Sequence, residues 1–202
     1  SSENIQNNHI AELKHSYNAG IILNQLNHTI NNFSNTIAIT YFPKTNEYCL
    51  LQENIKGIPF SDWIASTKFN MSDYYCCILQ IAFALNIAYR HCGFIHNDLY
   101  PWNIMIKEYS EDILINYKHC GKLFSIKTKF VPVIIDYGKS NIIIDNYYYK
   151  PYEKSIEIQD IVTLMVSSAY QILSKQHLGP QNTKKFIAFM NFITCSQYTN
   201  GK

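Results

Sequence analysis

The sequence predicts an α+β fold, on the strength of two observations. Segments with apolar residues three and four positions apart, typical of helices, are interspersed with short runs rich in Ile, Thr and Tyr, typical of strands. The 202 residues are 47% hydrophobic and 16% charged, which is enough apolar surface for one sizeable core. We therefore expect a mainly helical body with short β-hairpins.

The first part of the chain is predicted to contain one helix and one hairpin. Residues 3–28 place apolar side chains near a 3.6-residue period, which predicts a helix. Residues 36–42 and 47–53 alternate loosely and flank a turn that contains proline and asparagine, which predicts a hairpin. Gly57 ends this unit, and Ser61 is the expected cap of a short helix.

The middle of the chain is predicted to contain a long helix, a hairpin and a buried strand. Ser72 is the expected cap of the helix, and Gly93 lies just past its end, where a left-handed residue is favoured. Residues 113–117 and 123–128 predict a hairpin. Residues 131–135 predict a short strand, whose proline indicates a strand start or a sheet edge.

The last part is predicted to be irregular at first and then helical. Residues 139–154 are rich in asparagine and tyrosine and are expected to form loops. Apolar residues at helical spacing begin near Ser155 and predict a long helix with Asp160 near its start. Residues 184–193 predict a final helix.

Two polar turns carry the residues most suited to chemistry. The first contains His96, Asp98 and Asn103 and lies between two apolar stretches; the second, Asp136 to Gly138, ends a predicted strand. Carboxylate and amide oxygens are the ligands that Mg²⁺ prefers. A carboxylate is also able to orient an incoming hydroxyl or to accept its proton.

This pair of motifs resembles that of the protein-kinase superfamily, whose catalytic loop is H-R-D-x-x-x-x-N and whose metal-binding turn is D-F-G. The resemblance implies that Asp98 is the catalytic carboxylate and that Asn103 and Asp136 bind Mg²⁺. It implies a structural role for His96 behind the loop, and a backbone bend at Gly138.

The resemblance implies further residues in the same site. Asp160 would be the buried aspartate that hydrogen-bonds the catalytic-loop backbone, although a charge placed to favour a helix start is the alternative. Glu53 and Ile55 would offer backbone atoms to adenine in the hinge between two lobes. Glu12 would be the ion-pairing glutamate of the first helix, and a shifted register would put Ser16 there instead.

The chain departs from the kinase pattern in several places. It has no Gly-rich loop and no lysine strand before the first helix, so residues 1–57 would form an incomplete N-lobe and residues 58–202 a C-lobe. A segment upstream of residue 1, or a partner chain, would complete it. Asn97 and Tyr100 replace the usual arginine and lysine of the catalytic loop. With these departures the chain looks most like haspin-type atypical kinases, and its composition resembles that of giant-virus proteins.

The resemblance implies an ATP- and Mg²⁺-dependent kinase that phosphorylates serine or threonine in a protein substrate. The alternatives are a pseudokinase that acts as a binding module and a small-molecule kinase of the choline or aminoglycoside type. The net charge of +2 and a single arginine, Arg90, argue against a nucleic-acid partner. No run of 18 apolar residues occurs, so no membrane partner is expected, and a cytoplasmic or nuclear location is expected.

Overall fold

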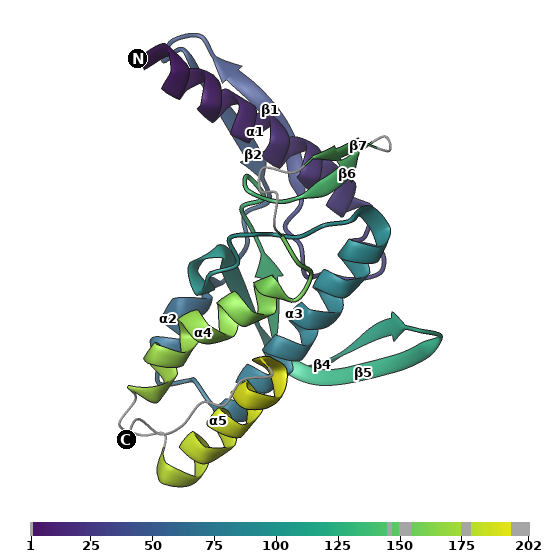
Figure 1. Ribbon diagram of the computed structural model, residues 1–202, viewed down its shortest axis with the longest axis vertical. Helices are drawn as coiled ribbons and strands as arrows, with labels where there is room; N and C mark the ends of the chain where they lie inside the picture. The colour runs from purple at the N-terminus through teal and green to yellow at the C-terminus, as the bar shows by residue number, and fades with distance from the viewer. Residues whose placement is uncertain (1, 145–146, 150–154, 175–178, 195–202) are drawn as a thin grey trace.

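The computed structural model describes residues 2–144, 147–149, 155–174 and 179–194. Among these residues the fold is α+β, as predicted, with helices and small antiparallel sheets (Figure 1). In chain order the elements are α1 (Ser2–Asn24), β1 (Thr36–Phe42), β2 (Glu47–Gln52), β3 (Ile58–Pro59), α2 (Phe60–Ala65), α3 (Met71–Cys92), the 3-10 turn η1 (Pro101–Asn103), β4 (Ile104–His119), β5 (Lys122–Ile134), β6 (Ile142–Ile144), β7 (Tyr147–Tyr149), α4 (Gln159–Leu173) and α5 (Gly179–Thr194).

The molecule is elongated, with its sheets placed along its length. Figure 1 shows α1 with β1 and β2 at one end, α4 and α5 at the other, and the β4–β5 hairpin projecting to one side. β1 and β2 form one antiparallel pair, β6 and β7 another, and β3, β4 and β5 form a three-stranded sheet in that order. β5 is therefore an edge strand, which explains how it accommodates Pro132.

The central helix α3 ends at the predicted glycine, but a different residue from the predicted one caps its start. Asn70, not Ser72, precedes the helix, and its side-chain oxygen accepts the N–H of Asp73 at 2.9 Å. At the other end Gly93 adopts the left-handed conformation with φ 63°. Ser61 is likewise not a cap, because α2 begins at Phe60 and no side chain caps it.

Three other expectations about elements were wrong. α1 ends at Asn24 rather than at residue 28, since the chain turns from residue 25. β4 and β5 are longer than predicted and absorb the strand expected at 131–135, because the exposed residues 108–112 of β4 are mostly polar and give no apolar alternation. The stretch expected to be irregular at 139–154 contains the antiparallel pair β6 and β7.

The core lies around α2, α3 and α4 and is rich in aromatic rings. Phe60 stacks on Trp63 and on Tyr74, with ring centroids 5.5 and 5.8 Å apart, and all three side chains are buried. The hydroxyl groups of Tyr74 and Ser168 on α4 are hydrogen-bonded at 2.8 Å, which joins the two long helices across this core. The core thereby holds the loop between α3 and β4 at a fixed place.

One helix, α3, is long and apolar enough to cross a membrane by length and composition. Half of its most apolar window is buried inside the molecule, as is usual for the central helix of a packed core. The property is therefore weak support for a membrane span.

Candidate functional site

The polar loop between α3 and β4 is held from behind by α4. The carboxylate of Asp160, which is buried, accepts the backbone N–H groups of His96 at 2.7 Å and Asn97 at 2.9 Å. Burial raises the pKa of Asp160, while the His96 ring and these two N–H groups act in the opposite direction. Asp160 thus binds the loop backbone, which is the geometry expected for it, rather than only favouring a helix start.

The same loop presents Asp98 and Asn103 on its two sides. The Asn103 side-chain N–H₂ donates to the backbone oxygen of Asp98 at 2.8 Å, and its backbone N–H donates to Tyr100 at 2.9 Å. His96 is buried, and its ring contacts the N–H of Asp98 at 3.3 Å and the carbonyl of Ile135 at 2.9 Å. Both ring nitrogens are thus engaged by backbone groups of the two polar segments, so His96 supports the loop from inside.

In the turn after β5, the side chain of Tyr137 points into the core, whereas that of Asp136, the residue before it, is exposed. Tyr137 is fully buried, and its hydroxyl donates to the carbonyl oxygens of Ile134 and Ser34 at 2.9 and 3.1 Å. Burial raises the pKa of Tyr137. The preceding residue, Asp136, is exposed and has φ 63°, a left-handed backbone that a non-glycine residue adopts at an energetic cost. The tyrosine anchor thus fixes an outward-facing carboxylate.

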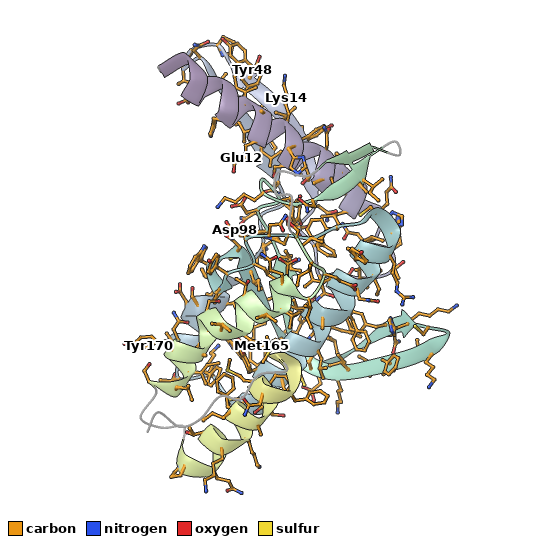
Figure 2. All side chains as sticks on the ribbon, viewed as in Figure 1. Glu12, Lys14, Tyr48, Asp98, Met165 and Tyr170 are labelled. Carbon is orange, nitrogen blue, oxygen red and sulfur yellow. The ribbon has the colours of Figure 1, made fainter. Side chains whose placement is uncertain are left out.

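The two polar segments lie next to each other in the structure, although Asn103 and Asp136 are 33 residues apart in the sequence. The backbone N–H of Ile135, next to Asp136, donates to the carbonyl of Asn103 at 3.0 Å. The ammonium of Lys139 lies 2.9 Å from Oδ2 of Asp98. The backbone segments that carry Asp98, Asn103 and Asp136 therefore lie side by side, at the junction between the α1–β1–β2 part and the helical body, where Figure 2 labels Asp98.

Asn103 and Asp136 carry side-chain oxygen atoms of the kind that a hard divalent cation prefers. The Asn103 side-chain nitrogen is used within the loop, which leaves its oxygen as the atom for a cation. The carboxylate of Asp136 is exposed and accepts one hydrogen bond, a long one of 3.4 Å from the N–H of Gly138. No group of three or more His, Cys, Asp or Glu side chains suited to a metal occurs among the described residues. Mg²⁺ bound by one or two protein oxygens usually completes its shell with phosphate and water.

The first helix reaches the same turn through Glu12. A Cβ atom added to Gly138 would lie 2.9 Å from Cγ and Oε1 of Glu12, so the glycine permits this close approach. Ser16, the alternative in a shifted register, is buried one turn further along α1. Both residues, with Gln52 of β2 and Asp136, line a cleft of about 370 Å³. The labels in Figure 2 show Glu12 and Asp98 on neighbouring parts of the molecule.

The coil between β2 and β3 contains the two residues whose backbone atoms were expected to bind adenine. Glu53 and Ile55 lie in the coil of residues 53–57 between β2 and β3. The Glu53 carboxylate contacts Lys107 at 3.4 Å and Asn35 at 2.7 Å, and its N–H donates to the Asn35 carbonyl at 2.9 Å. Within the described residues, no backbone partner contacts the carbonyl of Glu53 or either backbone group of Ile55.

An aromatic pair flanks the site beside Asp98. The rings of Tyr100 and Trp102 are parallel, with centroids 4.6 Å apart and an interplanar angle of 4°. Trp102 is 57% exposed although it follows a buried proline and precedes the buried Asn103. An exposed stack of this kind is able to bind a flat or cationic group.

Sequence reasoning missed Lys139, the cation that contacts Asp98. Its only local signal is its place directly after the Asp-Tyr-Gly turn, because the 41 residues that separate it from Asp98 hide the ion pair.

Comparisons with known proteins identify relatives but no established activity. The chain is similar to "Uncharacterized protein 179R" of Invertebrate iridescent virus 6, at 36% identity over 149 residues, and to "Uncharacterized protein 035R" of Invertebrate iridescent virus 3, at 29% over 148. These alignments cover 68% and 67% of the chain, which spans 13% of each viral protein. It is also similar to "Uncharacterized protein ZK177.2" of Caenorhabditis elegans, at 34% identity over 88 residues, or 42% of this chain and 27% of that protein. No protein-family model matches the chain.

Proposed function

We propose that the chain carries the phosphoryl-transfer site of an atypical, haspin-like protein kinase, which transfers the γ-phosphate of ATP to a serine or threonine hydroxyl in a protein substrate. The observation that carries the proposal is the meeting of the two polar segments. Asn103 and Ile135 are joined through their backbones at 3.0 Å, which supports a single site to which Asp98, Asn103 and Asp136 would supply oxygen atoms.

The chain's own residues account for the steps that such a transfer requires. Asn103 and Asp136 would hold Mg²⁺, which when bound neutralises charge on the phosphate oxygens. Asp98 would orient the acceptor hydroxyl and accept its proton, since one carboxylate oxygen remains available when Lys139 occupies the other. Glu53 would bind the adenine edge through its carbonyl and Ile55 through its carbonyl and N–H, for which no backbone partner occurs among the described residues.

The second candidate is a small-molecule kinase, for which the aromatic pair would offer a binding surface. Tyr100 and Trp102 lie in the same loop as Asp98 and are stacked with their planes parallel. Aromatic faces bind quaternary ammonium groups, so an amine of the choline type would suit this position. A protein segment with an aromatic or basic residue beside its hydroxyl would suit it equally, and the acceptor experiment decides between them.

The test is a transfer assay with radiolabelled ATP in the full-length protein. Wild type and Asp98→Ala are incubated with Mg²⁺, [γ-³²P]ATP and either a protein mixture of casein and histones or the amines choline and an aminosugar. Asp112→Ala is the matched control, because Asp112 pairs with Lys127 on the projecting hairpin away from the site.

We expect label on protein, reduced about 10²-fold or more in Asp98→Ala and unchanged in Asp112→Ala. Label on the amines alone would replace the protein-kinase proposal with the small-molecule one. Nucleotide binding without transfer to any acceptor would overturn catalysis and favour a pseudokinase that acts as a binding module.

A further inference from the structure

Lys139 places a positive charge at the carboxylate proposed to meet the acceptor hydroxyl. Its Nζ lies 2.9 Å from Oδ2 of Asp98. The lysine side chain is 46% exposed and that of Asp98 22%, so the pair faces solvent instead of the core.

The backbone around Lys139 is fixed to the catalytic loop. The side-chain N–H₂ of Asn97 donates to the Lys139 carbonyl at 3.0 Å. Two residues later, Asn141 and Ile95 exchange backbone hydrogen bonds of 2.7 and 3.0 Å. The residue between, Ser140, is buried and donates its hydroxyl to Tyr137 at 2.8 Å. The backbone of Lys139 is therefore fixed relative to Asp98, and the ammonium group at the end of its side chain lies beside that carboxylate.

Stability alone gives little reason for this ion pair. Pairs at such exposure contribute weakly to folding, since water and salt screen them. In the part of the chain that the structure describes, no other lysine or arginine contacts Asp98 or Asp136. Lys107, on β4, is paired with Glu53 instead. Without Lys139, the residues that the structure describes would present carboxylates to a phosphate with no paired lysine or arginine beside them, although phosphoryl transfer spreads negative charge over three oxygens.

We propose that Lys139 binds the phosphoryl group under transfer and orients Asp98 for the acceptor, an assignment that rests on the proposed function. In the step it assists, the acceptor oxygen forms a bond to the γ-phosphorus. The bond from that phosphorus to the bridging oxygen breaks, and its electron pair leaves with ADP. The hydroxyl proton passes to Asp98. Lys139 stays protonated throughout and contacts a non-bridging oxygen, as a compact cation suits.

The test compares Lys139→Met and Lys139→Arg with Lys68→Met in the full-length protein. Lys68 is a matched control, because its ammonium pairs with Glu108 at 2.6 Å on an exposed surface outside the site. Two quantities are measured: the single-turnover rate of ³²P transfer at saturating Mg²⁺·ATP, and the affinities for AMP-PNP and for ADP.

We expect Lys139→Met to lower the transfer rate about 10²-fold, as the loss of a charge-stabilising donor does. We expect it to weaken AMP-PNP about tenfold while ADP, which lacks the transferred group, binds as before. Lys139→Arg should recover part of the rate and the AMP-PNP affinity, and Lys68→Met should match wild type.

Two results would overturn the inference alone. One is a Lys139→Met transfer rate within threefold of wild type, and the other is equal weakening of AMP-PNP and ADP, which a merely structural role would give. A wild-type protein that binds no nucleotide and labels no acceptor would overturn the proposed function as well, and is thus distinguishable from both.

Discussion

Replacing Asp160 tests how the loop that carries Asp98 is held. The Asp160 carboxylate is the acceptor for the backbone N–H groups of His96 and Asn97, at 2.7 and 2.9 Å. In Asp160→Ala both N–H groups lose this partner in a buried place. Each hydrogen bond to a charged group is worth about 1.5–3 kcal/mol. Because burial raises the pKa of Asp160 and offsets part of the gain, we take the lower value for each bond, about 3 kcal/mol in all.

The assay is urea unfolding at pH 7, followed by the fluorescence of the buried Trp63. Asp160→Asn keeps one acceptor oxygen and should lose about half as much as Asp160→Ala. Glu157→Gln is the control, since exposed Glu157 accepts a hydrogen bond from the Asn86 side chain at 2.8 Å, and this variant should cost less than about 1 kcal/mol. An Asp160→Ala variant as stable as Glu157→Gln would refute the account of the loop.

The remaining predictions concern buried tyrosines and thiols. Burial raises the pKa of Tyr74, Tyr117 and Tyr137, so the unfolded chain loses these protons first as pH rises. The contribution of these tyrosines to the free energy of unfolding is complete below about pH 10. Above that pH it is lost at about 1.4 kcal/mol per pH unit for each tyrosine. Urea unfolding midpoints that stay constant from pH 9 to 11 would contradict this. Burial raises the pKa of Cys92 to about 11, so about one thiol in a thousand is ionised at pH 8. Iodoacetamide should therefore label the exposed Cys120 in the folded protein and leave Cys92 unmodified, as mass spectrometry of peptides would show; equal labelling of the two would contradict it.

Local sequence signals identified most elements because these depend on nearby residues. Gly93 ends α3 as predicted, since a left-handed residue at a helix end favours glycine whatever surrounds it. The choice of Asn70 over Ser72 as cap was missed, although Asp73 lies three residues after Asn70, the spacing at which a cap side chain meets a backbone N–H. The β6–β7 pair was missed because an asparagine- and tyrosine-rich stretch was given more weight than the isoleucine run that begins it.

The same distinction between features set by nearby residues and features set by distant contacts applies to the candidate site. Asp98, Asn103 and Asp136 were predicted as site residues because each belongs to a short motif, and the backbones of the two motifs are hydrogen-bonded between Asn103 and Ile135. The contact of Glu12 with Gly138 and the choice between Glu12 and Ser16 depend on how α1 packs, which its sequence spacing does not determine. Lys139 was missed for the same reason, because its partner is distant along the chain.

The most direct test of the central claim is binding of Mn²⁺, in place of Mg²⁺, with ADP, followed by electron paramagnetic resonance in the full-length protein. Wild type should bind the ion tightly only when ADP is present, because Asn103 and Asp136 alone supply two oxygen atoms. Asp136→Asn and Asn103→Ala should each abolish this binding, whereas Asp112→Ala should not. Undiminished Mn²⁺·ADP binding by both site variants would contradict the claim that these side chains form one cation site.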